Sequence, residues 1–119
     1  MPSNIYKEIS SLLDAYKTCE RKSNIEWKVK HYDSIKKLID KLPFNCTLDF
    51  QNSNPEKLIV DFTYEEINDA GYSNGYKPYE LVITPSLQFG IKIRIIGENK
   101  HQVKDYFHDC FSSVESEEN

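Results

Sequence analysis

The stretch "EKLIVDFTYEE", residues 56–66, alternates apolar and polar side chains with a period of two. Successive side chains of an extended chain point to opposite faces, so the two kinds separate in space. One face collects Leu58, Val60, Phe62 and Tyr64, and the other collects Asp61, Thr63 and Glu65. Such a strand is typical of an antiparallel sheet that is covered on one side only.

Three further segments carry the same pattern. "CTLDF" (46–50) precedes the stretch, and "YELVITP" (79–85) and "LQFGIKIRIIG" (87–97) follow it. The last segment separates an apolar from a basic face, with Phe89, Ile91, Ile93 and Ile95 on one and Lys92 and Arg94 on the other. Because "TPSL" (84–87) has proline where a tight turn favours it, we expect the last two strands to form a hairpin.

Helical periodicity precedes the strands. A first helix is predicted over residues 4–19 from the spacing of Ile5, Ile9, Leu12, Leu13 and Tyr16. A second should begin at a capping box of Ser23 and Glu26 and end before Pro43. Its apolar face collects Trp27, Tyr32, Ile35, Leu38, Ile39 and Leu42. Residues 1–42 are therefore predicted to form an antiparallel helical hairpin.

A third helix is predicted over residues 99–114, with Asn99 as its N-cap and Gln102 at its third position. Its apolar stripe is formed by Val103, Tyr106, Phe107, Cys110, Phe111 and Val114. The polar end, residues 115–119, should fray. The order α-α-β-β-β-β-α predicts one α+β domain over residues 1–119, an antiparallel four-stranded meander sheet (43–97) with helices packed on one face.

The 119 residues are acidic overall, with a formal net charge of -4 and a mean hydropathy of -0.63. The charge is uneven, since residues 1–42 carry nine Lys or Arg and six Asp or Glu, whereas residues 43–119 carry six and thirteen. An acidic chain lacks the positive field that drives non-specific nucleic-acid binding. With no signal peptide and no apolar stretch of about 18 residues, we expect a soluble cytoplasmic protein. Its three cysteines, Cys19, Cys46 and Cys110, are then expected to be reduced.

The chain has none of the common catalytic spacings: no glycine-rich phosphate loop, G-x-S-x-G, C-x-x-C or H-E-x-x-H. His101 and His108 share a helix face near Asp105 and could hold a metal, but a solvated face explains them more simply. His31 is expected to be a partly buried structural histidine. Cys110 lies two residues from His108, on another helix face, which argues against a Cys–His dyad. We therefore predict no enzymatic activity, no metal and no cofactor.

Four carboxylates gather around the end of the second strand: Asp61, Glu65, Glu66 and Asp69. Paired carboxylates can serve as acid and base or bind a hard cation. The open face also carries Lys92 and Arg94, so cross-strand ion pairs are the simpler explanation for Asp61 and Glu65.

Five lysines follow the second helix: Lys28, Lys30, Lys36, Lys37 and Lys41. Glu26, Asp33 and Asp40 alternate with them, as on a solvated, salt-bridged face, and Trp27 is expected on the opposite side. The order helix, three strands, helix also occurs in double-stranded-RNA-binding domains, but the basic loop that such a domain needs is absent here. The sequence argues against nucleic acid as the partner.

"INDAGYSNGYKPYE", residues 67–80, reads as a loop that is longer than a hairpin needs. Tyrosine gives a large amphipathic contact area, and glycine and asparagine let the backbone adapt, which is the composition of a recognition surface. Alternatively the tyrosines fold back over the core. The second alternative suits Tyr79, which begins a strand, and both stay open for Tyr72 and Tyr76.

The motifs "TPSLQFG" (84–90) and "VKDYF" (103–107), with "AGYSNGY" (70–76), resemble a family of small uncharacterised proteins encoded by bacteriophages, prophages and mobile elements. The resemblance covers about residues 35–111. It departs at "PFNCT" (43–47), where the family has a Gly/Ser-rich turn, and at Tyr76, where the family has tryptophan. It lends no catalytic residues and implies an accessory protein that binds a host protein, often a defence component.

The leading hypothesis is a non-enzymatic binding protein of phage or mobile-element origin that inhibits a host defence system. Its expected contact set pairs aromatic anchors with carboxylates that steer a basic partner: Tyr72, Asn74, Tyr76, Glu66 and Asp69. A second hypothesis is a small-ligand or nucleotide sponge whose tyrosines stack on a base. A third is a structural phage component that self-assembles through its open sheet face or an edge strand.

Overall fold

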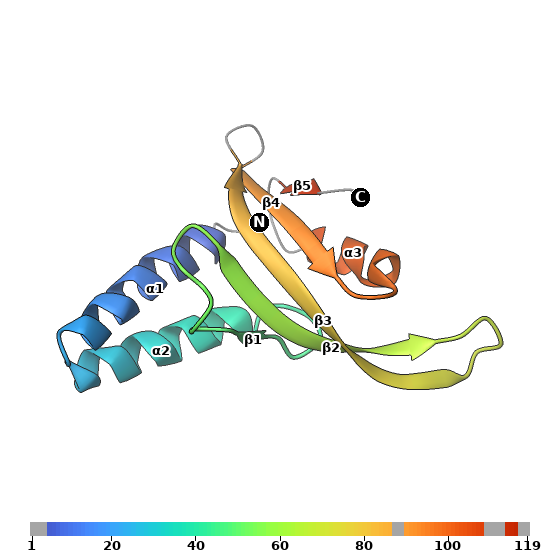
Figure 1. The fold of residues 1–119 in the computed structure, drawn as a ribbon, viewed down its shortest axis with the longest axis horizontal. Coiled ribbons are helices and arrows are strands. Elements are labelled where there is room, and N and C mark those ends of the chain that lie inside the picture. The colour runs from blue at the N-terminus through green and yellow to red at the C-terminus, as the bar shows by residue number, and fades with distance from the viewer. Residues whose placement is uncertain (1–4, 87–89, 109–113, 117–119) are drawn as a thin grey trace.

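The computed structural model describes residues 5–86, 90–108 and 114–116. Its helices are α1 (Ile5–Arg21), α2 (Ile25–Ile39) and α3 (Lys100–His108). Its strands are β1 (Thr47–Leu48), β2 (Leu58–Ile67), β3 (Ser73–Ser86), β4 (Gly90–Ile96) and β5 (Val114–Ser116). The predicted α+β class, with helices on an antiparallel meander of four strands in the order α-α-β-β-β-β-α, is confirmed (Figure 1). None of the described helices is both long and apolar enough to cross a membrane.

The sheet gains a fifth strand at its β4 edge. β1 to β4 pair antiparallel in chain order, and β5 lies parallel to β4, with Val114 opposite Ile91 and Ser116 opposite Ile93. The predictions of a helix to residue 114 and of a frayed end from residue 115 are therefore wrong for residues 114–116. Val114 and Ser116 are poor helix formers, whereas the edge of β4 offers main-chain hydrogen bonds. Cys110, Phe111 and the tight turn at 84–87 fall wholly or partly outside the described residues.

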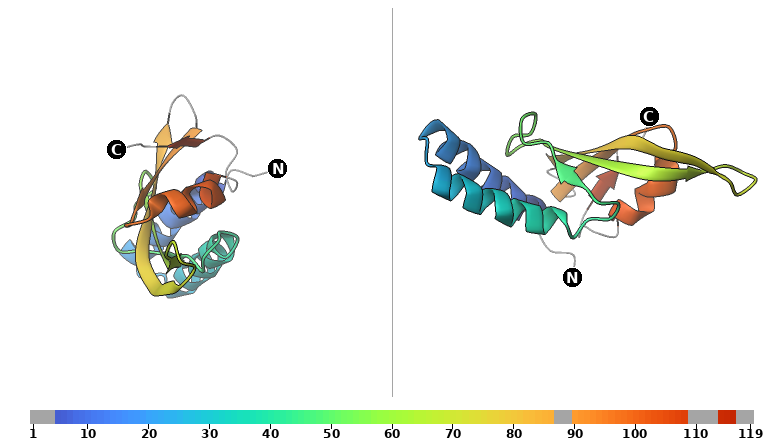
Figure 2. Two further views of the ribbon diagram at one scale, coloured as in Figure 1. Left: turned by 90° about the vertical axis from the view of Figure 1, so that its right-hand side faces the viewer. Right: turned by 90° about the horizontal axis from the view of Figure 1, so that it is seen from below.

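One face of the sheet forms the core. Its buried strand residues are Leu58, Val60, Phe62, Tyr79, Leu81, Ile83, Ile91, Ile93 and Ile95. The helices contribute Ile9, Leu13, Ile35, Val103 and Phe107, each fully buried. Figure 2 shows the α1–α2 hairpin and α3 on the same side of the strands. The period-two pattern thus separates a covered face from an open one, as the sequence predicts.

The helical hairpin covers the sheet with only one of its ends. Buried residues lie in the first half of α1 and the last half of α2, and the connecting end projects away from the strands (Figure 1). Trp27, predicted on the buried face of α2, is accordingly 48% exposed, and Ile25 and Val29 are exposed as well. Periodicity identifies the apolar stripe of a helix but not how far the neighbouring sheet extends beneath it.

The start of α2 also differs from the prediction. Asn24 is the N-cap, and its Oδ1 accepts a hydrogen bond from the Trp27 amide at 3.3 Å. Ser23 instead has a φ of 56° and ends α1 in the left-handed conformation. The helix stops at Ile39, before the predicted Leu42.

The turn from α2 into β1 is strained. Phe44 and Asn45 have φ values of 67° and 54°, and a bulky residue in the left-handed region is an outlier. This conformation inserts the Phe44 ring among the rings of Phe62 and Phe107, at centroid distances of 5.6 and 5.8 Å. Packing of the ring therefore stabilises a backbone that the "PFNCT" segment would not adopt alone.

Candidate binding site at the tip of the β2–β3 hairpin

The segment predicted as a long loop is mostly strand. β3 begins at Ser73, and Tyr76 lies opposite Glu65 while Pro78 lies opposite Thr63. Among the described residues, β1 pairs with β2 only up to Asp61, and β4 pairs with β3 only from Glu80 onward. Beyond those points β2 and β3 form a two-stranded hairpin that projects from the body (Figure 1). We call the exposed residues of 65–77, which exclude Glu66, the hairpin tip.

Asn68 organises the turn at the end of the hairpin tip. Its Oδ1 accepts hydrogen bonds from the amides of Ala70 at 2.9 Å and Tyr72 at 3.0 Å. Its backbone amide donates to the Tyr72 carbonyl at 2.9 Å, and the Gly71 amide donates to the Asn68 carbonyl at 2.9 Å. Gly71 has a φ of 87°, which other residues adopt only under strain. The turn is thus held by its own hydrogen bonds.

A β-bulge follows the turn. The pairing register shifts between Glu65 and Ile67, and Gly75, in the opposite strand, has a φ of 89°. The Ser73 hydroxyl donates to Glu65 Oε2 at 3.1 Å and accepts from the Gly75 amide at 3.1 Å. These contacts hold the backbone of the bulge next to Tyr76, and a bulge re-aims the side chains beside it.

The structure places four of the five predicted contact residues on the surface. Tyr72 is 72% exposed and Tyr76 is 69% exposed, and Asp69 and Asn74 are exposed too. The rings of Tyr72 and Tyr76 therefore face solvent and do not fold back over the core. The fifth residue, Glu66, is only 3% exposed, so it cannot contact a partner in this structure.

Glu66 belongs instead to a buried polar cluster with Tyr79 and Asn99. The Tyr79 hydroxyl donates to Glu66 Oε2 at 3.1 Å, and the Asn99 side-chain amide donates to the same oxygen at 2.8 Å. The Asn99 backbone amide donates to the Tyr79 hydroxyl at 2.8 Å. Asn99 precedes α3 as predicted, but its side chain serves this cluster. A buried carboxylate is tolerated because these donors replace water.

Burial raises the pKa of Tyr79 above its ordinary value of 10.0; the backbone amide of Asn99 opposes this shift, and the Glu66 carboxylate adds to it. The Tyr79 ring also lies directly on Gly97, where an added Cβ would come within 2.1 Å of a ring carbon. The base of the hairpin is therefore closely packed, unlike its tip.

The predicted cross-strand ion pairs on the open sheet face are wrong. Asp61 lies opposite Glu80, while Arg94 lies opposite Val82 and Lys92 opposite Thr84. Partial burial, and then the charge of Asp49, raises the pKa of Asp61. Face assignments follow from the period of two, but the register that decides which charges meet depends on the hairpin bulge and turns.

The remaining candidates have structural surroundings. His31 is half-buried and stacks on Trp27 at 5.9 Å between ring centroids. Lys28 pairs with Glu20 at 3.3 Å, and Lys30 lies 4.6 Å above the Trp27 ring. Trp27 is thus beside a lysine, contrary to the predicted separation of the two. No group of three metal-ligating side chains occurs within residues 5–86, 90–108 and 114–116.

Neither a protein-family model, nor a curated protein, nor a solved structure matches this chain.

Proposed function

We propose that this protein is a non-enzymatic binding protein whose hairpin tip docks on a basic surface of a protein partner. One observation carries the proposal: two tyrosines, about 70% exposed, lie on a projecting hairpin whose turn and bulge are fixed by internal hydrogen bonds. Large exposed aromatic side chains on a preorganised element lose little conformational entropy on binding. Tyr72 and Tyr76 are the proposed anchors, with Asn74 beside them.

The charge of the hairpin tip favours a basic partner. Glu65 and Asp69 are exposed there, against one exposed cation, Lys77. Glu65 is held by the Ser73 hydroxyl and so keeps a defined position near Tyr76. Rim carboxylates of this kind mainly accelerate association with a positively charged surface. Because Glu66 is buried, we replace it by Glu65 in the proposed set of contact residues.

The resemblance to small phage-encoded proteins indicates where the partner is to be sought. We infer a host protein in the cytoplasm, and a component of a defence system in particular. The nucleotide sponge has less support, because Tyr72 and Tyr76 point to solvent and do not fold over a cavity. Self-assembly through strand edges is also less favoured, since Pro78 removes a donor from the outer edge of β3.

The test is capture from host lysate with the tagged protein and a Tyr72→Ser/Tyr76→Ser variant. If each anchor contributes a typical hot-spot energy of about 2 kcal/mol, the double variant loses roughly 1,000-fold in affinity for the captured protein. A matched control is Ile25→Ser/Val29→Ser, which removes exposed apolar side chains from the far end of α2. Thermal unfolding of all three proteins verifies that each is folded.

Loss of the partner by the tip variant and retention by the α2 variant supports the proposal. Equal capture by both variants contradicts the placement at the hairpin tip. In a second measurement, Glu65→Gln/Asp69→Asn should slow association at low salt and leave dissociation nearly unchanged. An unchanged association rate would exclude electrostatic steering by these carboxylates.

A further inference from the structure

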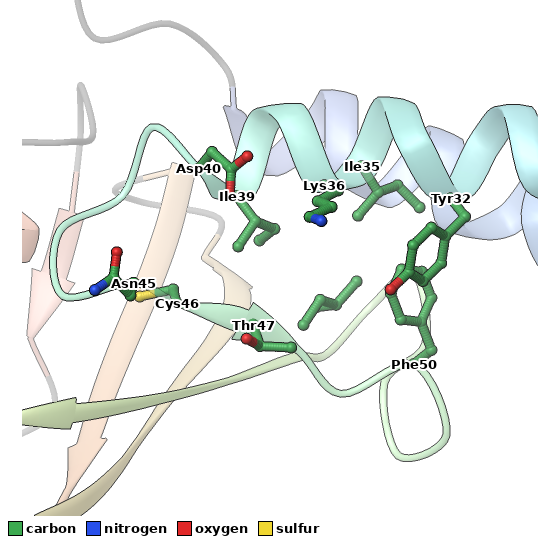
Figure 3. A pocket seen from close by; sticks show the side chains of 10 residues that line it. Tyr32, Ile35, Lys36, Ile39, Asp40, Asn45, Cys46, Thr47 and Phe50 are labelled. Carbon is green, nitrogen blue, oxygen red and sulfur yellow. The ribbon is translucent and has the colours of Figure 1, made fainter.

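A cavity of about 240 Å³ lies between α2 and residues 45–50 (Figure 3). Both walls lie away from the hairpin tip (Figure 1). The cavity exists because the left-handed residues Phe44 and Asn45 turn the chain sharply after α2 and bring β1 back alongside the helix. Helix and strand then form opposite walls. The cavity was not predicted, since no periodicity or motif marks it.

The floor of the cavity is aliphatic and one end is aromatic. Ile35, Ile39 and Leu48 form the floor and are at most 4% exposed. At the end, the rings of Tyr32 and Phe50 stack at a centroid distance of 4.9 Å (Figure 3). Because these rings stack on each other, they form a wall and leave no slot between them for a nucleobase. The floor therefore suits an apolar side chain.

Two opposite charges flank this apolar space. Lys36 lies in the last turn of α2 and Asp40 is the C-cap residue of that helix, and both line the cavity. Neither side chain forms an ion pair within 4.0 Å with another described residue. On the facing wall, Asn45 and Thr47 offer an amide and a hydroxyl (Figure 3). The rim thus presents one cation and one anion about a single apolar floor.

We propose that this cavity binds a free α-amino acid with a large apolar side chain, such as leucine or phenylalanine. The side chain would occupy the floor, the α-carboxylate would pair with the Lys36 ammonium, and the α-ammonium would pair with the Asp40 carboxylate. The volume equals that of about eight liquid waters, below the roughly 300 Å³ at which pockets for drug-sized ligands begin. A phosphorylated ligand is disfavoured, because Asp40 repels it and only one lysine attracts it.

The ligand side of the test compares L-phenylalanine and L-leucine with three analogues, by titration followed in ¹H–¹⁵N correlation spectra of the full chain. N-acetyl-L-phenylalanine lacks the ammonium, L-phenylalaninamide lacks the carboxylate, and glycine lacks the side chain. We expect dissociation constants on the order of 1 mM for the two amino acids and at least about tenfold weaker binding for every analogue. The shifted amides should belong to residues 32–50.

The protein side compares charge-removing variants inside and outside the cavity. Lys36→Gln and Asp40→Asn should each weaken L-phenylalanine binding about tenfold. Lys37→Gln and Asp33→Asn make the same changes on exposed positions of α2 that do not line the cavity, and should leave binding unchanged. All four are surface substitutions that the fold tolerates.

Three results would overturn the inference: no shifts with either amino acid at tens of millimolar, equal binding of the acetylated or amidated analogue, or equal weakening by cavity and control variants. Each leaves the proposal for the hairpin tip intact, because the capture experiment uses different residues.

Discussion

The two faces of the β2–β3 hairpin place the same kinds of residue in opposite surroundings. On the face toward the core, Tyr79, at the base, and Glu66 are buried and bonded to each other. On the other face, at the tip, Tyr76 and Glu65 lie opposite one another and are exposed. Because successive side chains of a strand alternate between its faces, neighbouring carboxylates of β2 have different surroundings. Environment, not residue type, therefore distinguishes the two pairs.

The most damaging single change should be Gly97→Ala, at the base. The new Cβ would overlap the Tyr79 ring, which is itself buried, so the ring or the backbone must shift. We expect a loss of about 3 kcal/mol in the free energy of unfolding, measured by urea denaturation. Gly71→Ala at the tip is the matched control, with open space but a φ of 87°, and should cost only about 1 kcal/mol. Equal losses would refute the tight contact at Gly97.

Removing one hydroxyl at each end compares the two directly. Tyr79→Phe removes one of the two donors to Glu66 Oε2 and leaves the Asn99 backbone amide without its acceptor, which should cost about 1–3 kcal/mol in unfolding free energy. Tyr76→Phe removes a hydroxyl from an exposed ring and should change stability by less than about 0.5 kcal/mol. Urea denaturation measures the unfolding free energy of both variants. Equally small losses in the two would mean that the hydrogen bonds of the Tyr79 hydroxyl add nothing to stability.

The burial of Tyr79 at the base should also lower the unfolding free energy of the protein at alkaline pH. The pKa of Tyr79 is raised by burial, so the neutral phenol is favoured in the folded state. Its contribution is complete below the ordinary value of 10.0 and is lost as the pH rises through the raised value. The unfolding free energy should therefore fall above about pH 10, and less steeply in Tyr79→Phe. Tyr6, whose pKa is also raised by burial, keeps part of the slope in that variant. A variant with the full wild-type slope would contradict the assignment to Tyr79.

The smallest effect is expected on the open sheet face, one residue pair from Tyr79 toward the body of the sheet. Asp61 lies opposite Glu80, and its pKa is raised by partial burial and by the charge of Asp49. Its protonated form is thus favoured in the folded state, and the ionised carboxylate weakens the fold at neutral pH. Asp61→Asn should raise the unfolding free energy by about 0.3 kcal/mol at neutral pH, and the gain should vanish below the ordinary pKa of 3.8. Thermal scans at both pH values test this, and a gain that persists in acid would point to another cause.

The sequence predicts those features of the structure that a local periodicity determines. The alternation at residues 58–66 assigns Glu66 to the same face as Leu58 and Phe62, and applied one residue further it would have predicted the burial of Glu66. The loop-like composition of the residues that follow favours the opposite assignment, a surface contact. Glycine and proline at positions 75 and 78 favour a loop, but Gly75 lies at the β-bulge and Pro78 lies within β3, opposite Thr63.

Other features depend on contacts between distant segments, and no local pattern shows them. The exposure of Trp27 depends on where the sheet ends beneath α2, and the pairing of Asp61 with Glu80 depends on register. The cavity beside Lys36 depends on a backbone conformation at Phe44 that the chain adopts only when the aromatic core has formed. Each requires the folded arrangement of at least two elements.

The strand order has a consequence for how quickly the chain folds. β1 to β4 are adjacent in the sheet in the order in which they follow one another along the chain. Most contacts of the sheet therefore join residues of modest sequence separation, and loop-closure entropy opposes their formation only weakly. The turn held by Asn68 offers a local starting point. β5 pairs parallel to β4, and the connection between the two strands contains α3, so β5 can pair only after α3 is in place. We therefore expect the docking of the C-terminal segment to be the last step of refolding.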